Sequence, residues 1–585
     1  MRILALGLVL LVNVVGGCGS KEAPRPNVLL ISIDSLRRDL VGAYGFESPF
    51  APGVSSSPAL DALALEGALF ENAYATTSWT LPSHLTMLTG QPELVHGVDI
   101  DYHVADPSRR LLAERLSAVG YRTAGFFSGP YLDPDFGFGR GFERYEACYG
   151  PALREATRAK AALEAEIERS RRGAVGTPTV DELTRRMNDA ILAVENESHR
   201  DVSSRTVTDA ALAELEAAAA GDRPFFLFAH LFDPHYDYVP PPPHDRTFDA
   251  DYTGAITGLD LLEDPAISHP DPRATGPGQL VQVANERDMQ HIRALYAGEL
   301  AWVDEQLRRV LERLDALGLA ESTLVIVTSD HGDEFFEHGS LGHRNTLFEE
   351  ITQVPLIVRW PGRVAAGTRI APLASTVDLV PTVLDWLRLA DDTSGTSLVP
   401  LLEGREDPRE RAVLGRMVRA WNVGLMVPDR SGTPQSVAGQ LVVLTESYHW
   451  GSLKLLRERS WPRLPNAVLD ALPREARDRF EAQQALGRAT ESLRWIDLAV
   501  HPDERPENFS TDFSSAPAQA ALERWRERYV DLNADRLAAI EAGGVAVPRD
   551  TSEHNEQLRA LGYAGGELDS EPLPPGEFSL PAPGH

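Results

Sequence analysis

Short apolar runs alternate along the chain with longer amphipathic stretches. Residues 28–34 (VLLISID) form the first run, whose leucine and β-branched residues are typical of a strand buried in a parallel sheet. Similar runs occur at 225–231 (FFLFAHL) and 323–329 (TLVIVTS). The stretches between them predict helices, at 57–70, 111–120 and 296–319. This alternation predicts an α/β fold with a mostly parallel central sheet that is flanked by helices.

The pattern changes at two places. Residues from about 151 to 200 are rich in Ala, Glu and Arg, and they predict a helical insertion on a main domain that spans 27–404. Beyond it, RAVLGRMVRAW, LVVLTESYHWGSLKLLRE and LRWIDLAVHPDE predict strands of a smaller antiparallel α+β subdomain at 405–515. We expect a helical extension at 516–565 and a Pro/Gly-rich disordered tail at 566–585.

The N-terminus has the pattern of an export signal, with Arg2, an apolar run and small residues before Cys18. Its ending, VGGC, resembles the bacterial lipobox, in which the cysteine becomes the lipidated first residue. We therefore expect a signal peptide at 1–17, a lipidated linker at 18–26, and a lipid anchor that holds the protein to the bacterial cell envelope, on its periplasmic or extracellular face. The alternative is an ordinary cleaved signal with an incidental cysteine.

Charge and cysteine content argue against a nucleic-acid-binding protein and against a fold held by disulfides. The net charge of −30 disfavours nucleic acid as a partner, because such binding depends on attraction to the phosphate backbone and no Lys/Arg-rich run offsets the charge. Only Cys148 remains after Cys18, so the mature chain has no intramolecular disulfide. We expect Cys148 to be a buried structural thiol.

Two apolar runs that are far apart in the sequence both end in an aspartate, Asp34 and Asp330. Ligands of open α/β sheets bind at the carboxyl ends of the strands, so the two acids can converge on one cation. His331 directly follows the second aspartate. Two carboxylates and an imidazole suit a divalent metal, although either aspartate alone is more commonly a helix cap or a turn residue.

The segment TTSWTLPSHLTMLTG (76–90) places Thr80 just ahead of Pro82, a residue suited to the first turn of a helix. Free N–H groups at such a helix start attract an anion. A hydroxyl that contacts a divalent metal can lose its proton near neutral pH and act as a nucleophile. A plain helix cap is the alternative interpretation of Thr80.

Several segments, in the expected order over roughly residues 27–404, resemble the sulfatase family of the alkaline-phosphatase superfamily. NVLLISIDSLRRDLVGAYG is similar to the opening metal strand of that family, and TLPSHLTMLTG to its Cys/Ser-x-Pro-Ser-Arg signature. Further segments that match are FDPHYDYVPP, YAGELAWVDEQL, TSDHGDEFFEHGSLGH, LFEEITQVPLIVRWPG and STVDLVPTVLDWL. The resemblance implies a metal-dependent hydrolase of small anionic esters.

The resemblance also implies roles for single residues. Asp34, Asp330 and His331 fall at metal-ligand positions, and Thr80 falls at the position of the nucleophile, where it also contacts the metal. Ser35 stands where the family has the second acid of an Asp-Asp pair. This leaner ligand set, which includes an imidazole, favours one zinc or manganese ion, with calcium as the alternative.

Three histidines complete the implied site. His235 and His343 fall where the family contacts the anion or protonates the leaving oxygen, and His343 replaces a common Lys. For both, an ordinary surface or core histidine is the alternative. His84 replaces the signature Arg.

Thr80 cannot yield formylglycine, the aldehyde that sulfatases make from the signature Cys or Ser, so we expect no formylglycine here. In having Thr as the attacking residue at this position, the chain resembles the phosphoethanolamine and lipoteichoic-acid transferases and the nucleotide pyrophosphatases of the same superfamily. We predict a hydrolase of phosphate or sulfate esters that favours phosphodiesters. The alternatives are a cell-envelope phospho-group transferase and a non-catalytic anion-binding lipoprotein, and the oligomeric state stays open.

Overall fold

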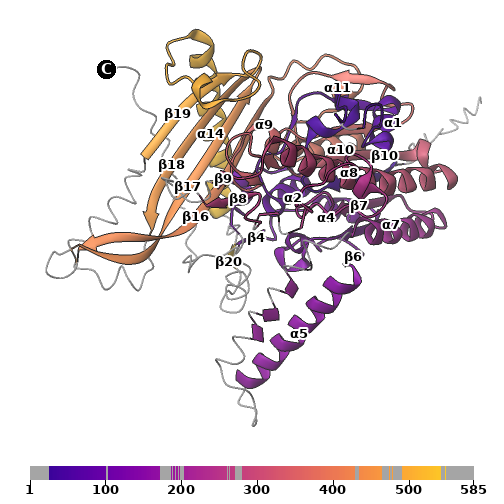
Figure 1. Ribbon diagram of the computed structural model, residues 1–585. Helices are drawn as coiled ribbons and strands as arrows, with labels where there is room; N and C mark the ends of the chain where they lie inside the picture. Colours follow the sequence, from indigo (N-terminus) through magenta and orange to yellow (C-terminus); the bar gives the residue numbers. More distant parts are fainter. Residues whose placement is uncertain are drawn as a thin grey trace, which may run out of the picture.

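The computed structural model describes residues 25–171, 203–428, 434–463, 490–541 and 547–548, with gaps at 50, 101–102, 260, 263 and 271–279 and with a few isolated helical residues at 186–197, 474 and 477 (Figure 1). The predicted export signal, the lipid anchor at Cys18 and the predicted tail lie outside these residues. No helix among the described residues is both long enough and apolar enough to cross a membrane.

A sheet of eight strands forms the centre of the described chain. Its order is β14 (Thr368–Ile370), β2 (Ala68–Phe70), β13 (Leu356–Arg359), β10 (Thr323–Ser329), β1 (Asn27–Ile33), β7 (Phe225–Leu231), β5 (Arg122–Phe127) and β6 (Arg144–Ala147). Strand β1 is parallel to both of its neighbours, β10 and β7, and only β13 runs antiparallel to the strands beside it. The prediction of a mostly parallel sheet is confirmed.

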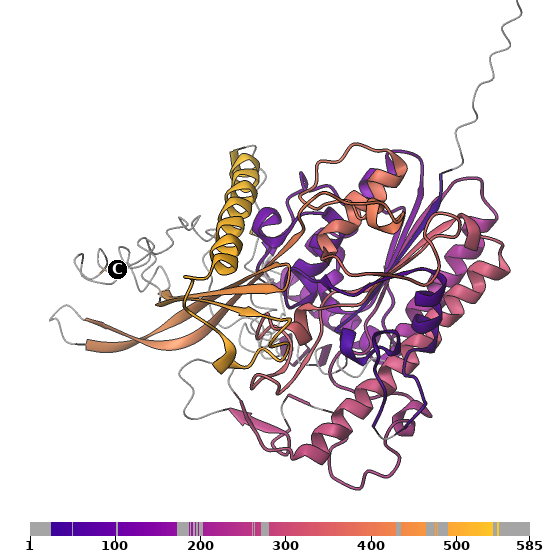
Figure 2. The same ribbon diagram turned by 90° about the horizontal axis from the view of Figure 1, so that it is seen from above.

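Helices cover both faces of this sheet (Figure 2). Along β1, Val28 and Leu30 pack into one hydrophobic core, and Leu29, Ile31 and Ile33 pack into another on the opposite face. The first core includes residues of α2 (Thr80–Thr89), α4 (Leu112–Ser117) and α10 (Leu379–Leu387). The second includes residues of α1 (Pro58–Glu66), α7 (Ser204–Ala219) and α8 (Glu286–Ala316). Burial on both faces explains why the strand sequences are continuously apolar.

The stretch at 57–70 differs from the single helix that its pattern predicts. Helix α1 ends at Glu66, and residues Ala68–Phe70 form β2. Gly67 lies between them, where an added Cβ would come within 2.4 Å of the carbonyl oxygen of Val358. Pairing of β2 with β13 therefore requires a close backbone approach that only glycine allows, and the helix stops there.

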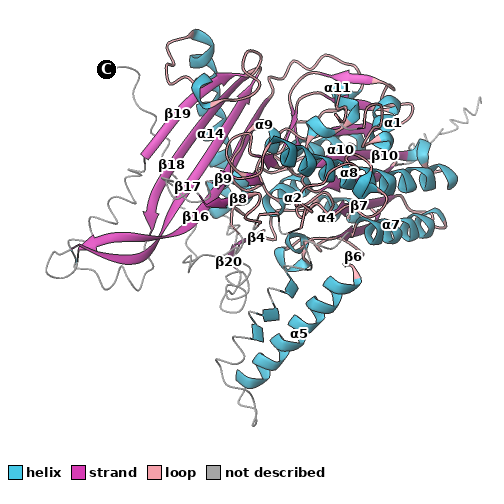
Figure 3. Cartoon of the chain, viewed as in Figure 1, coloured by secondary structure: helices cyan, strands magenta, loops and turns pink. Residues whose placement is uncertain are grey.

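The C-terminal part forms a second, antiparallel sheet of β16 (Ala412–Pro428), β17 (Pro434–Trp450), β18 (Leu453–Arg463) and β19 (Thr490–Asp497) (Figure 3). Helix α14 (Ala516–Glu541) packs on one face of it through Trp525 and Tyr529, against Tyr448 and Leu455. Leu94 of α3 (Glu93–His96) joins the same core. The predicted antiparallel arrangement is confirmed, and the two sheets are packed together.

The remaining elements are short, apart from α5 (Pro151–Arg171), which lies at the predicted insertion and projects away from the main body (Figure 1). The short elements are β3 (Ala73–Tyr74), β4 (His103–Val104), β8 (Ser268–Pro270), β9 (Leu280–Gln282), β11 (Glu334–Phe335), β12 (Leu341–Gly342), α9 (Glu349–Thr352), β15 (Ala374–Ser375), α11 (Val399–Leu402) and β20 (Val547–Pro548).

Candidate active site

Asp34 and Asp330 follow neighbouring parallel strands that end at the same level. Strand β1 pairs with β10 in a register that sets Ile33 opposite Ser329, so the residue after each strand reaches the same edge of the sheet. Both aspartates are fully buried. The structure therefore brings together the two acids that the sequence analysis singled out.

His331 lies against both aspartates. Its Nε2 atom is 3.3 Å from Oδ2 of Asp330 and 3.8 Å from Oδ1 of Asp34. Its Nδ1 donates a hydrogen bond to the carbonyl oxygen of Gly332 at 3.0 Å. A backbone acceptor on Nδ1 selects the tautomer whose Nε2 lone pair faces the carboxylates, which is the orientation of a metal-binding histidine.

Thr80 completes the group from the start of a helix. It is the first residue of α2, and Trp79 before it has an extended backbone. The hydroxyl oxygen of Thr80 lies 3.4 Å from Oδ2 of Asp34 and 3.4 Å from Nε2 of His331. The helix thus begins with its first side chain directed at the acidic cluster.

These residues fit a divalent cation. Oδ2 of Asp330 is buried without a hydrogen-bond partner among the described residues. Burial raises the pKa of Asp34 to about 7, against the effect of His331. Burial by itself lowers the pKa of His331, but the carboxylates of Asp330 and Asp34 outweigh it and raise that pKa. The cluster is therefore short of positive charge, which a divalent cation among its two carboxylates, imidazole and hydroxyl would supply.

Ser35 supports both acids. Its hydroxyl donates to Oδ1 of Asp34 at 2.9 Å, and its backbone N–H donates to Oδ1 of Asp330 at 3.1 Å. The residue has a φ of 53°, a left-handed conformation that is uncommon for a residue other than glycine. Ser35 therefore orients the candidate ligands by hydrogen bonds.

His84 lies beneath Thr80 and is fully buried. Its Nδ1 donates to the backbone carbonyl of Thr80 at 2.9 Å, and its Nε2 accepts from the hydroxyl of Ser32 at 2.9 Å. Burial, and then the neighbouring His230, lower the pKa of His84 to about 3. His84 is thus a neutral side chain that holds the start of α2, and its expected part in catalysis stays a prediction.

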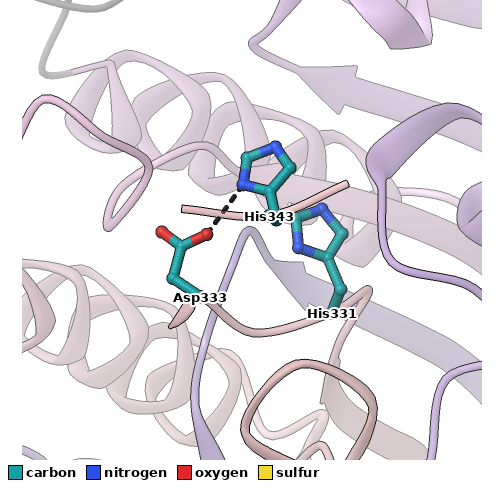
Figure 4. A group of neighbouring side chains, drawn as sticks. All are labelled: His331, Asp333 and His343. Atoms are coloured by element: carbon teal, nitrogen blue, oxygen red, sulfur yellow. Dashed lines mark hydrogen bonds and ion pairs between the residues drawn. The ribbon is translucent and has the colours of Figure 1, made fainter. Parts of the chain in front are cut away.

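His343 lies next to His331, and His235 lies next to His343. The ring centres of His331 and His343 are 4.3 Å apart, and those of His343 and His235 are 5.0 Å apart. Nδ1 of His343 donates to Oδ1 of Asp333 at 2.7 Å (Figure 4). The acid that orients His343 comes from the same loop as Asp330 and His331.

Sequence reasoning missed Asp333 and His230. Asp333 is fully buried, accepts a second hydrogen bond from the hydroxyl of Tyr238 at 2.6 Å, and has a pKa that burial raises. His230 lies in β7, with Nε2 at 3.2 Å from Oδ2 of Asp34. A histidine inside the apolar run FFLFAHL is a signal that could have identified His230. For Asp333, the only such signal is its position two residues after His331.

Comparisons with known proteins identify the family of this chain. The sequence profile of the sulfatase family matches residues 26–389. The N-acetylglucosamine-6-O-sulfatase of Bacteroides thetaiotaomicron is 23% identical over 440 residues, which cover 66% of this chain and 72% of the relative. The multifunctional alkaline phosphatase superfamily protein PehA of Trinickia caryophylli is 28% identical over 420 residues, which cover 65% of this chain and 78% of the relative.

Solved structures show the same fold. The phosphonate monoester hydrolase of Agrobacterium radiobacter superposes with a TM-score of 0.55 at 22% identity, over 88% of this chain and 96% of the other. Sulfatase-family enzymes bind a divalent metal, and the described residues contain a buried group of Asp34, Asp330 and His331 that can do so. With the profile matching well over half of its length, the chain belongs to the sulfatase family of ester hydrolases.

Proposed function

We propose that this chain hydrolyses phosphate or sulfate esters with Thr80 as the nucleophile, and that phosphodiesters are its preferred substrates. One observation carries the proposal: the hydroxyl oxygen of Thr80 is 3.4 Å both from Oδ2 of Asp34 and from Nε2 of His331. A side chain that capped the helix would occupy the N-cap position, but that position is held by Trp79, and the hydroxyl of Thr80 turns to Asp34 and His331.

Asp34, Asp330 and His331 would hold the cation, with Thr80 beside it. A divalent cation at this place lowers the pKa of a hydroxyl that contacts it and neutralises charge on the ester. The mixed oxygen and nitrogen donors favour zinc or manganese over calcium. The N-terminus of α2 presents backbone N–H groups to the non-bridging oxygens of the ester.

The reaction has two steps. Thr80 gives up its proton to solvent, its oxygen forms a bond to phosphorus, and the bond from phosphorus to the leaving oxygen breaks. His343, oriented by Asp333, gives the leaving oxygen a proton from Nε2. Water then attacks phosphorus and gives one proton to His343, the bond from phosphorus to Thr80 breaks, and Thr80 regains a proton from solvent. His235, next to His343, contacts the anion.

Two points support phosphorus chemistry and the preference for diesters. A threonine cannot form the aldehyde on which sulfate hydrolysis in this family depends. The buried carboxylates of Asp34 and Asp330 balance the charge of one divalent cation, which suits a singly charged diester better than a doubly charged monoester. Among the similar proteins, PehA is described as multifunctional and the Agrobacterium enzyme as a phosphonate monoester hydrolase.

We also propose that Cys18 carries a lipid anchor and that the enzyme works at the bacterial cell envelope, on the strength of the signal-like N-terminus. Mass spectrometry of the mature N-terminus from a bacterial host tests this point. A diacylglyceryl group on Cys18 is the expected result, and cleavage elsewhere with an unmodified cysteine contradicts it.

The test of the nucleophile compares Thr80→Val with Thr80→Ser in the chain without its signal. Both variants keep the size of the side chain close to that of threonine, but only serine keeps the hydroxyl. With zinc or manganese supplied, Thr80→Val should lose about a thousandfold or more in kcat on an aryl phosphodiester, and Thr80→Ser should keep measurable turnover.

Turnover that survives Thr80→Val would remove Thr80 from its role. Aryl phosphomonoester and aryl sulfate, tested with the same protein, should react more slowly than the diester, and a strong preference for sulfate contradicts our ranking. An added alcohol distinguishes hydrolysis from transfer: a new ester of that alcohol as the main product would favour the transferase. Binding of the anion without turnover in the unaltered chain would favour a binding protein.

A further inference from the structure

A fully buried lysine joins the C-terminal sheet to the loop that follows His343. Lys454 lies in β18, and its Nζ donates to the carbonyl oxygen of Leu347 at 2.7 Å. The same ammonium group is 3.1 Å from Oε1 of Glu349 and 2.7 Å from Oε1 of Glu504. Such a buried cation is costly unless it is paired, so its position is determined by these partners.

Glu349, the first residue of α9, is the centre of this network. Its carboxylate also contacts Nε2 of His449 at 2.9 Å and accepts from the hydroxyl of Tyr74 at 2.8 Å. Its backbone N–H donates to Oε2 of Glu504 at 2.7 Å. The attraction of Lys454 and His449 holds the pKa of Glu349 well below its usual range although burial opposes this. The start of α9 is therefore fixed on two sides, by the main domain and by the C-terminal sheet.

The segment between His343 and Glu349 is held from both the main domain and the C-terminal sheet, and Arg344 also contacts Tyr131 and the ring of Trp79. The backbone N–H of Arg344 donates to the carbonyl of Ser78 at 3.0 Å, and Arg344 has a φ of 65°. Arg419 of β16 donates to the carbonyl of Asn345 at 3.2 Å. A left-handed conformation at a large residue persists only where surrounding contacts enforce it. These contacts come from the main domain and from the C-terminal sheet.

We propose that Lys454 is a positioning residue for proton donation by His343: it clamps the backbone at Leu347 and Glu349 and so sets the place of His343 against the leaving oxygen. This inference rests on the proposed role of His343. It assigns a catalytic purpose to the packing of the C-terminal sheet against the main domain, beside α9 (Figure 1).

The same strand offers a matched control. Arg457 is also buried in β18, where it pairs with Glu446, but its guanidinium lies over the rings of Trp525 and Tyr529 of α14. Lys454 and Arg457 are three residues apart, so they lie on opposite faces of the strand. Arg457→Met therefore removes a buried cation whose contacts lie with Glu446 and α14, on the face of the strand opposite Lys454.

The experiment measures kcat and KM for two diesters of the same phosphate, one with a nitrophenyl leaving group and one with a methyl leaving group. A nitrophenolate departs without a proton, whereas an alkoxide needs one, so the ratio of the two kcat values reports on the general acid. The proteins are the metal-loaded full chain and its Lys454→Met, Lys454→Arg, Glu504→Gln, Arg457→Met and His343→Ala variants.

His343→Ala should lower kcat on the methyl ester by about a hundredfold and change the nitrophenyl ester little. Lys454→Met should lower the methyl-to-nitrophenyl ratio by about tenfold with unchanged KM, and Lys454→Arg should restore most of it. If Lys454→Met does not fold, Glu504→Gln replaces it in the test. Glutamine still accepts the hydrogen bond from the backbone N–H of Glu349 but forms no ion pair with Lys454, so this variant should show the same selective loss to a smaller extent. Arg457→Met should leave the ratio unchanged.

The positioning role is overturned if Lys454→Met lowers kcat equally on both esters while His343→Ala still shows the selective loss. If Lys454→Met does not fold, the same result in Glu504→Gln overturns it. A selective loss in Arg457→Met as large as in Lys454→Met also overturns it, because a general weakening of the sheet then suffices. If His343→Ala itself is not selective, His343 is not the acid, and both the proposed acid step and the role of Lys454 are wrong. The activity of Thr80→Val tests the nucleophile alone. Its result does not depend on the roles of His343 and Lys454, so failure of the proposed nucleophile is distinguishable from failure of the positioning role.

Discussion

Asp333 accepts a hydrogen bond from Nδ1 of His343 at 2.7 Å. The other oxygen of Asp333 accepts from Tyr238 at 2.6 Å, so the carboxylate cannot turn away from the imidazole without loss of a second bond. This pair holds the proton of neutral His343 on Nδ1 and stabilises the charged ring. A charged His343 can then donate a proton from its other nitrogen, Nε2.

Asp333→Asn should therefore weaken the acid step. The amide keeps the size of the side chain but can present N–H to Nδ1, which selects the wrong tautomer of His343. We expect kcat on a methyl phosphodiester to fall by about a hundredfold, with a smaller fall on a nitrophenyl diester. Steady-state kinetics on the two substrates check this. Equal kcat values for Asp333→Asn and the unaltered chain on the methyl ester would contradict it.

Removal of the metal should abolish turnover and lower thermal stability. Asp34 and Asp330 are buried carboxylates whose mutual repulsion a bound cation relieves. Return of zinc or manganese at about a hundred times Kd should restore about 3 kcal/mol of the free energy of unfolding. Calorimetry with metal analysis measures the metal affinity and the free energy of unfolding.

Asp330→Asn should bind the metal at least about tenfold less tightly than the unaltered chain. Ser35→Ala, which removes a hydrogen bond to a metal ligand, should lower the metal affinity by less. Unchanged metal content in Asp330→Asn would exclude it as a ligand.

His96 should contribute to loss of stability in acid. Burial, and then Arg109, lower the pKa of His96 to about 3, and the backbone N–H of Val98 donates to Nδ1 of His96 at 3.1 Å, which requires the neutral ring. In the unfolded chain this histidine titrates near pH 6.5, so below that pH the unfolded state binds the extra proton and stability falls.

The size of this effect follows from the pH interval. Between pH 6.5 and 4.5 the contribution of His96 is roughly 2 kcal/mol, because each pH unit well below 6.5 costs about 1.4 kcal/mol and the unfolded histidine is half protonated at pH 6.5. His96→Gln, which stays neutral, should reduce the difference in unfolding free energy between these two pH values by that amount. Urea titrations at both pH values measure it, and an identical pH dependence in the variant would show that the histidine is not buried in its neutral form.

Cys148 should resist alkylation in the folded protein. Its thiol is buried, and burial raises its pKa to about 11, so little thiolate exists near neutral pH. We expect iodoacetamide at pH 8 to leave Cys148 unmodified over hours in native buffer and to modify it within minutes in denaturant. Mass spectrometry detects the adduct. Fast reaction in native buffer would show that the thiol is exposed.

The amino-acid sequence predicted the elements of the fold that depend on local pattern. Continuous apolar runs indicated the buried strands, and their ends located Asp34 and Asp330 at one edge of the sheet. Proline near a helix start located Thr80. These features are readable because burial on two faces, strand polarity and helix termini each restrict the residue types at a few neighbouring positions.

Pairing between distant segments was decided by the tertiary structure. His230 reaches Asp34 only because β7 lies beside β1, and Lys454 reaches Leu347 across 107 positions of the chain. The break of the predicted helix at Gly67 depends on the approach of Val358, which no local pattern encodes. The sequence by itself therefore determined which residues are apolar, which segments form the buried strands, and which acids follow them, but it placed the start of α8 at 296 instead of 286. Only the packed sheet decided which polar groups meet, because a buried charge takes its partner from whatever strand or loop the fold places next to it.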